Sequence, residues 1–400
     1  MPPGSLLASL PPAPAERTGW PWHVETSPAC YAHRSDWPRI SIVTPSFNQT
    51  AFVEETIRSV LLQNYPNLQY IVMDGGSTDS TVSILENYSP WIDYWVSERD
   101  RGQSHAINKG LARCDGEWFN WINSDDYLLP AALAKLADAG RDQSVQILAG
   151  VTRNVRDGCA FGSYSASMRA PWPQGLFFLG VNQPGSLVRL AGLRADGPVR
   201  DDLKFCMDLE LWLRLLLRHG PGAMCLAPET VAAYRYHAES KTCSADDAFA
   251  LEEFAVLTDM VFSVPGVALE PVRWVRQQCP AAMRSCSSPV PLDSAGATKA
   301  YLDRLLVSDS LLFRSLRRAP SRPAPLADCF LDLLRTLNPF LVSHFSAAVA
   351  RSAQATALIR AMQHLGRLQF RMAVRALTLS PRPKTAVELL RIAYRSFFPS

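Results

Sequence analysis

The stretch ISIVTPSFNQTAFVEETIRSVLLQNYPNLQYIVMD, residues 40–74, decides the fold class of this chain. It holds two short apolar runs rich in β-branched residues, which predict strands, and a helical pattern between them. In that pattern Val53, Ile57 and Val60 fall on one face, so we expect the helix to pack against a sheet. A strand, a helix and a second strand in this order begin a mostly parallel α/β sheet flanked by helices.

The same alternation continues beyond this stretch. The further expected elements are a helix after Ser77, a strand at residues 92–98, a helix from Ser104 and a strand at residues 116–126. After about Gly150 the pattern is less regular, and it contains a predicted helix at residues 207–219 and a predicted strand at residues 229–237. We therefore predict an α/β domain over residues 39–255.

Two flanking regions differ in composition from this domain. Residues 1–38 are rich in proline and have little periodicity, so we interpret them as a flexible or loosely packed arm. Residues 256–400 begin with a Pro/Ser-rich connecting stretch and continue into basic helical segments, which predict a C-terminal α-helical region. Its arginine-rich amphipathic end indicates peripheral contact with a membrane, although arginines on the solvent side of packed helices would give the same pattern.

Composition narrows the class of protein. The 400 residues are 48% hydrophobic with a net charge of +3, which gives no reason to expect a nucleic acid partner. The nine cysteines form no CxxC pair, so neither a zinc site nor a disulfide framework is expected. No secretory signal pattern is present, and no run reaches the roughly 18 apolar residues of a spanning helix. We expect a cytoplasmic protein, with peripheral contact at the inner face of a membrane as the less favoured alternative for its basic C-terminal region.

Polar segments rich in glycine or acids follow four of the predicted strands. They are TPSFN at 44–48, DGGSTD at 74–79, SERDRGQS at 97–104 and NSDD at 123–126. Ligands of open α/β sheets bind beyond the carboxyl ends of the strands. We therefore expect a diphosphate and a divalent cation between Asp74 and the NSDD segment, with the two strands side by side.

Asp74 and Asp125 each allow two interpretations. Asp74 precedes two glycines that let the backbone approach a ligand, but Ser77 or Asp79 could cap the next helix with no ligand present. Asp125 is a hard oxygen ligand suited to Mg²⁺ or Mn²⁺, or else part of a solvated Asp-Asp turn. The segment after residue 73 is not GxGxxG, so no dinucleotide site is predicted.

Three segments in this order, residues 40–81, 97–111 and 116–130, closely resemble the family 2 glycosyltransferases with the GT-A fold. The resemblance covers about residues 39–242. It implies inverting transfer of a sugar from a nucleotide diphosphate, with a UDP-sugar as the favoured donor and Mg²⁺ or Mn²⁺ as cofactor. A glycan or glycolipid acceptor, and a role in polysaccharide or glycoconjugate synthesis, would follow.

The resemblance also assigns roles to individual residues. On the donor side, Thr44, Pro45 and Phe47 would lie against the nucleobase, Asp74 would bind the nucleobase or ribose, and Gln103 and Asn123 would bind the nucleotide sugar. Asp125 and His237 would hold the metal, Gln183 would face the acceptor, and Asp208 would be the catalytic base with Glu210 in reserve. Lys241 is a weak candidate for contact with the diphosphate that no family motif assigns. One departure is that Asn123 replaces the first acid of the family's Asp-x-Asp motif. An amide adds no charge to a cation site, so metal affinity should be weaker.

Competing interpretations remain open at this point. An acid in the first turn of a helix, such as Asp208, is also favoured by the helix dipole alone, and a histidine such as His237 is often structural. A sugar-phosphate nucleotidyltransferase would carry glycine and lysine in the loop after the first strand, and TPSFNQTAF has neither. A non-catalytic nucleotide-sugar-binding or scaffold protein with the same fold is favoured only by Asn123.

Overall fold

The computed structural model describes residues 5–168, 176, 179–241, 249, 252, 253, 256, 257, 259 and 260. The predicted C-terminal helical region therefore lies, apart from its first few residues, outside the described part of the chain.

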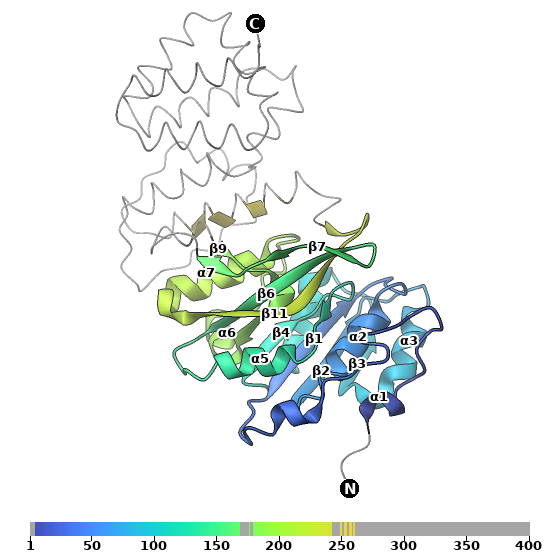
Figure 1. The fold of residues 1–400 in the computed structure, drawn as a ribbon. Coiled ribbons are helices and arrows are strands. Elements are labelled where there is room, and N and C mark those ends of the chain that lie inside the picture. The colour runs from blue at the N-terminus through green and yellow to red at the C-terminus, as the bar shows by residue number, and fades with distance from the viewer. Residues whose placement is uncertain are drawn as a thin grey trace, which may run out of the picture.

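The described residues form a mixed α/β fold built on one large curled sheet (Figure 1). Its strands are β1 (Ile40–Ser46), β2 (Leu68–Asp74), β3 (Tyr94–Ser97), β4 (Trp118–Trp121), β5 (Tyr127–Leu128), β6 (Ile147–Arg156), β7 (Cys159–Tyr164), β10 (Ser186–Arg189) and β11 (Met224–Tyr236). They are arranged in the order β3-β2-β1-β4-β10-β6-β11-β5, with β7 paired to β6. The short strands β8 (Ser167–Met168) and β9 (Leu179–Gly180) pair separately.

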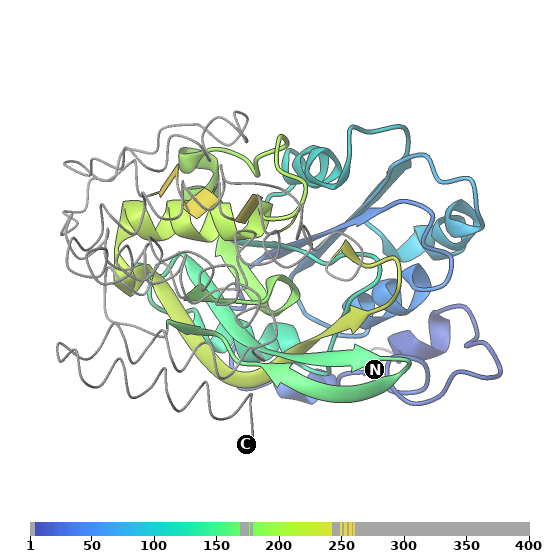
Figure 2. The same ribbon diagram turned by 90° about the horizontal axis from the view of Figure 1, so that it is seen from above.

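The predicted α/β class is confirmed, with one difference in strand direction. Strands β3, β2, β1 and β4 are all parallel, as the alternation of strands and helices predicts. Beyond them β10 runs antiparallel to both β4 and β6, and β5 runs antiparallel to β11. The second half of the sheet is therefore mixed, because it is built from long-range pairings that local periodicity does not encode. Figure 2 shows β6 and β11 curving together along one side of the molecule.

Helices cover both faces of the sheet. The main ones are α2 (Val53–Leu61), α3 (Thr81–Tyr88), α4 (Gln103–Leu111), α5 (Ala132–Ala139), α6 (Leu190–Asp196) and α7 (Met207–His219), and the short α1 (Leu6–Ser9) precedes them. Adjacent residues of β1 enter opposite cores: Val43 lies in the core that includes residues of α4 and α7, whereas Ile42 lies in the core that includes residues of α2 and α5. This alternation along one strand is what a sheet buried on both faces requires.

The core on the α7 face continues past the predicted domain boundary. Val256, Leu257 and Met260 are buried in the same cluster as Leu211 and Leu215 of α7. The α/β domain therefore extends at least to Met260 and does not end at residue 255.

The N-terminal segment differs from the predicted loose arm. Trp22, Tyr31 and Trp37 are buried in the core on the α2 face. The guanidinium of Arg58 in α2 is itself buried and donates to the carbonyls of Pro11, Pro21 and Trp22. The proline-rich composition did not predict this packing, because a few widely spaced aromatic rings of the segment and the buried Arg58 are enough to hold the segment against the domain.

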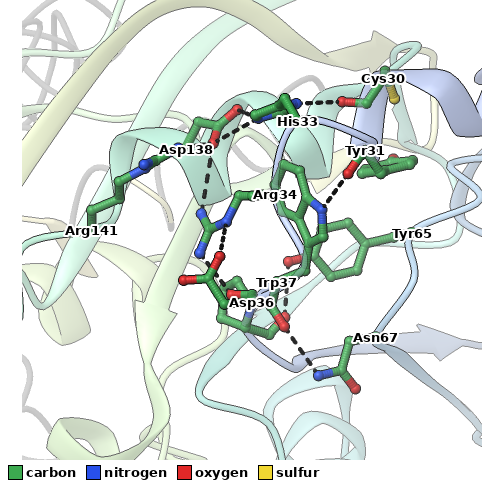
Figure 3. Close-up of polar contacts among 11 residues, drawn as sticks. Cys30, Tyr31, His33, Arg34, Asp36, Trp37, Tyr65, Asn67, Asp138 and Arg141 are labelled. Carbon is green, nitrogen blue, oxygen red and sulfur yellow. Dashed lines mark hydrogen bonds and ion pairs between the residues drawn. The ribbon is translucent and has the colours of Figure 1, made fainter.

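A second set of contacts fixes the end of this segment (Figure 3). The rings of Tyr31, Trp37 and Tyr65 meet edge to face, with centroids 5.2 to 5.7 Å apart. His33 lies 3.1 Å from a carboxylate oxygen of Asp138, and Arg34 also pairs with that carboxylate. The chain thus enters β1 from a fixed direction, with residues 28–38 joined to both α5 and the loop before β2.

Candidate active site

The strand ends that the sequence singles out lie along the carboxyl edge of the parallel half of the sheet. One predicted neighbour relation is wrong, because β1 pairs with both β2 and β4 and so lies between them. Asp74, at the end of β2, is therefore not beside the NSDD segment that follows β4. The residues after β1, beginning with Phe47, separate the two acids.

Asp125 and His237 meet at this edge. His237 Nε2 lies 2.9 Å from Asp125 Oδ2, although the residues are 112 positions apart in the sequence. Asp125 follows β4 and His237 follows β11, and both side chains are partly buried. The ring of Phe52 packs on His237 with centroids 4.8 Å apart, which restricts the orientation of the imidazole. The two residues assigned to a metal are thus brought together.

A chain of side-chain hydrogen bonds runs beside this pair. Lys241 Nζ donates to Gln103 Oε1 at 2.5 Å, and Gln103 Nε2 donates to Asn123 Oδ1 at 2.6 Å. Asn123 Nδ2 then donates to Asp126 Oδ2 at 3.3 Å. The predicted nucleotide-sugar residues Gln103 and Asn123 are therefore in direct contact, and Lys241 joins them.

Asp126 has a structural position. It is buried, and its Oδ1 accepts a hydrogen bond from the backbone N–H of Arg235 in β11 at 2.9 Å. Burial, and then the charge of neighbouring Asp125, raises the pKa of Asp126 well above its usual value. Asp126 ties the NSDD turn to β11, and Asp125 is left as the acid facing the site.

Asp74 is buried and uses its carboxylate inside the protein. Its Oδ2 accepts from the backbone N–H groups of Gly76 and Ser77 and from Ser97 Oγ, at 3.1, 2.8 and 2.6 Å. Its Oδ1 accepts from Ser77 Oγ at 2.5 Å. These four bonds shape the DGGST turn, so the geometry of Asp74 is that of a residue that organises the loop.

Of the three residues assigned to the base, only Phe47 is at the surface. Its side chain is 57% exposed, which is unusual for a large aromatic residue at a strand end. Thr44 and Pro45 are buried in β1, and Thr44 Oγ1 lies 3.0 Å from the hydroxyl of Tyr70. Thr44 and Pro45 therefore support the end of β1 from inside the protein, and Phe47 is the ring that can stack on a ligand.

Asp100 was not singled out by the sequence, and it lies next to Phe47. A Cβ added to Gly75 would be 2.8 Å from Asp100 Oδ2 and 3.4 Å from the Phe47 ring. Asp100 Oδ1 accepts from the backbone N–H of Gly102 at 2.7 Å, which holds the carboxylate at the start of α4. The available signal was the acid in SERDRGQS directly before a helix. Glycine at residue 75 allows Phe47 and Asp100 to approach each other.

Asp208 lies in the first turn of α7 and is partly buried. Its Oδ1 accepts from the backbone N–H of Leu209 at 2.8 Å. Burial raises the pKa of Asp208 to about 6, and Glu252 adds to this, while backbone hydrogen bonds and the charge of Lys241 oppose it. A carboxyl with this pKa can exchange a proton near neutral pH, which suits a general base. Glu210, the reserve candidate, is paired with Arg214 at 2.9 Å and is less available.

Glu252 was missed by the sequence analysis. Its carboxylate accepts from three consecutive backbone N–H groups, those of Lys204, Phe205 and Cys206, at 2.6 to 3.0 Å. These donors immediately precede α7, so Glu252 fixes the entry of the helix that carries Asp208. No local pattern announces this role, because the partner residues lie 46 to 48 positions away.

Gln183 does not face an open site in this structure. It is buried, and its Nε2 donates to Asn120 Oδ1 at 2.8 Å and to the carbonyl of Trp121 at 2.5 Å. Its Oε1 has no protein partner among the described residues. Gln183 thus joins the loop before β10 to β4, and its assignment to the acceptor is not apparent from its position.

The fit of a divalent cation rests on Asp125 and His237. Within the described ranges, no group of three or more His, Cys, Asp or Glu residues converges as a metal cage. Mg²⁺ and related ions commonly take one or two protein carboxylates and the rest of their ligands from substrate phosphates and water. One carboxylate with a neighbouring imidazole fits that pattern, with Mn²⁺ the better match for the nitrogen ligand.

Comparisons with known proteins show that part of this chain is similar in sequence to glycosyltransferases. Residues 41–190 match the sequence model of the family described as Glycosyl transferase family 2. The chain is 37% identical over 97 residues to the putative teichuronic acid biosynthesis glycosyltransferase TuaG of Bacillus subtilis, covering 23% of this chain and 38% of that protein. It is 32% identical over 103 residues to the GalNAc(5)-diNAcBac-PP-undecaprenol beta-1,3-glucosyltransferase of Campylobacter jejuni, covering 25% and 33%. The match thus spans less than half the length of these curated relatives.

Solved structures agree in fold. S. aureus TarS 1–349 in complex with UDP-GlcNAc superposes with a TM-score of 0.53 at 15% identity, covering 84% of this chain and 91% of that one. The same TarS fragment in complex with UDP gives a TM-score of 0.51 at 15% identity, covering 86% and 93%. At this level of identity the likeness establishes the shared glycosyltransferase fold.

Proposed function

We propose that this chain, whose residues 41–190 belong to glycosyl transferase family 2, is an inverting glycosyltransferase that moves a sugar from a nucleotide diphosphate to an acceptor hydroxyl. The observation that carries the proposal is the meeting of Asp125 and His237 at 2.9 Å, from strand ends 112 residues apart. Donor activation would use this pair, and proton removal would use Asp208, whose carboxyl has a pKa of about 6.

The donor would lie along the edge that runs from Phe47 to Asp125. The exposed ring of Phe47 provides a stacking surface for the base, and Asp100, next to Gly75, can accept hydrogen bonds from the base or ribose. Asp74 would act through the turn that it holds. We favour a UDP-sugar, which is the class of donor bound in the TarS complex.

Asp125 and His237 would hold Mg²⁺ or Mn²⁺. Such an ion supplies positive charge to the diphosphate leaving group. Gln103 and Asn123, hydrogen-bonded to each other beside Asp125, would position the donor.

Asp208 would remove the proton of the acceptor hydroxyl. The acceptor oxygen forms a bond to the anomeric carbon from the face opposite the phosphate, and the bond from that carbon to the phosphate oxygen breaks. The electron pair leaves with the nucleoside diphosphate and the proton stays on Asp208, so the configuration inverts in one displacement. General-base help of this kind typically gives about a hundred- to ten-thousandfold in rate.

The acceptor proposed is a glycan or glycolipid in polysaccharide or glycoconjugate synthesis, in line with the names of the B. subtilis and C. jejuni relatives. We further propose that the protein works on the cytoplasmic side of a membrane and contacts it peripherally. In the described residues no helix has both the length and the apolarity needed to cross a bilayer.

The proposal is tested by incubating the full chain with UDP-, GDP- and dTDP-sugars and Mn²⁺, and by measuring release of the nucleoside diphosphate. We expect slow hydrolysis of one class of donor, and loss of that hydrolysis in Asp125→Asn. A protein that binds the nucleotide but releases no product from any donor, with or without glycan acceptors, would instead be the non-catalytic scaffold that Asn123 favours.

A further inference from the structure

Lys241 lies where the donor side and the base side of the site meet. Its Nζ donates to Gln103 Oε1 at 2.5 Å and to the carbonyl of Lys204 at 2.7 Å. Gln103 begins α4, whereas Lys204 precedes α7, so the ammonium group bridges the two helices that frame the site. Lys241 is an exposed residue, and these two hydrogen bonds hold its ammonium group in place.

The charges around Lys241 are mostly negative. Burial lowers the pKa of Lys241, while the carboxylates of Glu252, Asp208 and Asp125 act to raise it and the like charge of Lys204 lowers it further. Two of these carboxylates are the proposed base and the proposed metal ligand. Lys241 is therefore a cation close to both ends of the proposed reaction.

The hydrogen bonds of Asn123 explain why an amide stands at this position. Asn123 accepts from Gln103 Nε2 and donates to the buried Asp126. A carboxylate at residue 123 could accept the first bond but could not donate the second, and it would place a third acid beside Asp125 and Asp126. The amide that satisfies Asp126 thus removes one negative charge from the place where a divalent cation would bind.

We propose that Lys241 is a diphosphate-binding residue. A site with a single carboxylate binds a divalent metal ion weakly, and Lys241 supplies additional positive charge at the leaving phosphate. This inference rests on the proposed function. Gln103 and the Lys204 carbonyl hold the ammonium group in place before the donor binds. A lysine ammonium has three donors and acts on phosphate as a point charge, so at least one N–H remains for the ligand.

The test is a binding measurement that does not depend on turnover. Isothermal titration with UDP, uridine and inorganic pyrophosphate is carried out on the full chain in the presence of a chelator, and repeated with Mn²⁺. The variants are Lys241→Met, which removes the charge and keeps an apolar stem, and Lys241→Arg, which keeps the charge. Lys135→Met is the matched control, because Lys135 lies on α5 and its Nζ donates only to the carbonyl of Pro130 in the described contacts.

With chelator present, Lys241→Met should bind UDP and pyrophosphate about tenfold or more weakly, as expected for loss of a hydrogen bond to a charged group. Uridine should bind as tightly as it binds the wild type. Lys241→Arg should stay within about threefold of the wild type, since the charge is retained, and Lys135→Met should be unchanged. Addition of Mn²⁺ should reduce the deficit of Lys241→Met without removing it.

Two results would overturn the proposal. Undiminished UDP and pyrophosphate binding by Lys241→Met would show that the ammonium group does not reach the diphosphate. Equal weakening of uridine and UDP would show that Lys241 only supports the loop. The wild type reports separately on the proposed function: binding of pyrophosphate but not UDP refutes the UDP assignment and leaves Lys241 to be judged on pyrophosphate, while binding of neither refutes both.

Discussion

Replacing Asp208 by asparagine should stabilise the fold and abolish transfer at the same time. The pKa of Asp208 rises from 3.8 to about 6, chiefly through burial, so the ionised form is disfavoured in the folded protein. A rise of that size corresponds to about 3 kcal/mol at most, and because the side chain is partly exposed we expect about 1 to 3 kcal/mol. The amide oxygen can still accept the hydrogen bond from Leu209.

The sign of this effect depends on pH. A carboxyl whose folded pKa is raised contributes stability that is fully present below its unfolded pKa and is lost as the pH rises through about 6. Wild type and Asp208→Asn should therefore have similar free energies of unfolding at about pH 4, where the acid is protonated, and should differ by about 1 to 3 kcal/mol at about pH 8. Urea unfolding at the two pH values measures this difference.

The rate of sugar transfer should rise with pH, whereas the stability contributed by protonated Asp208 falls. The wild-type rate constant kcat should rise with pH through an apparent pKa near 6, because only ionised Asp208 accepts the acceptor's proton. Asp208→Asn should lose at least about a hundredfold in kcat with donor affinity unchanged. Glu210→Gln is the control, since Glu210 is engaged by Arg214. An Asp208→Asn protein that is less stable than wild type at about pH 8, or that transfers sugar normally, would refute the reasoning.

The remaining predictions concern the metal ligand, the part of the site proposed for the nucleobase, and the segment that precedes α7. Asp125→Asn should abolish turnover and weaken Mn²⁺-dependent donor binding in titrations. Asp126→Asn should affect turnover less, since the Asp126 side chain is buried. An unchanged wild-type rate in the presence of a chelator would contradict the metal assignment. Gly75→Ala places a Cβ 2.8 Å from Asp100 and should weaken UDP binding about tenfold, and equal affinity would exclude this side of the site. Glu252→Gln should lower the free energy of unfolding by about 1 to 2 kcal/mol, measured in urea, because an amide cannot accept all three N–H bonds before α7.

Much of the fold could be predicted because its signals are local. The periodicity of residues 40–74 specifies β1, α2 and β2, since each element places its apolar residues on the face that a sheet or helix must bury. The motif order resembles that of the family whose sequence model matches residues 41–190, and the helix expected at residues 207–219 forms with Asp208 in its first turn. Each of these helices and strands depends on residues that are close to one another in the sequence.

The roles of individual polar residues depend on contacts between distant segments. Asp74 and Gln183 look like ligand residues in the sequence, yet the structure buries both. The Asp74 carboxylate and the Gln183 Nε2 have partners inside the protein, whereas Gln183 Oε1 has none among the described residues. Glu252 carries no motif but holds three N–H groups before α7. Which acid is enclosed and which faces the site is decided by packing, because the same carboxyl group can serve either purpose.

The sequence by itself therefore determined the alternating strands and helices up to about residue 126, and it predicted the edge of the sheet where a ligand would bind. Only the tertiary structure decided that Asp125 meets His237, that the buried Asp126 accepts from the backbone N–H of Arg235, and that Lys241 reaches Gln103. The physical reason is that hydrophobic periodicity is a property of neighbouring residues. A hydrogen bond between residues more than a hundred positions apart exists only once the sheet has brought its strand ends together.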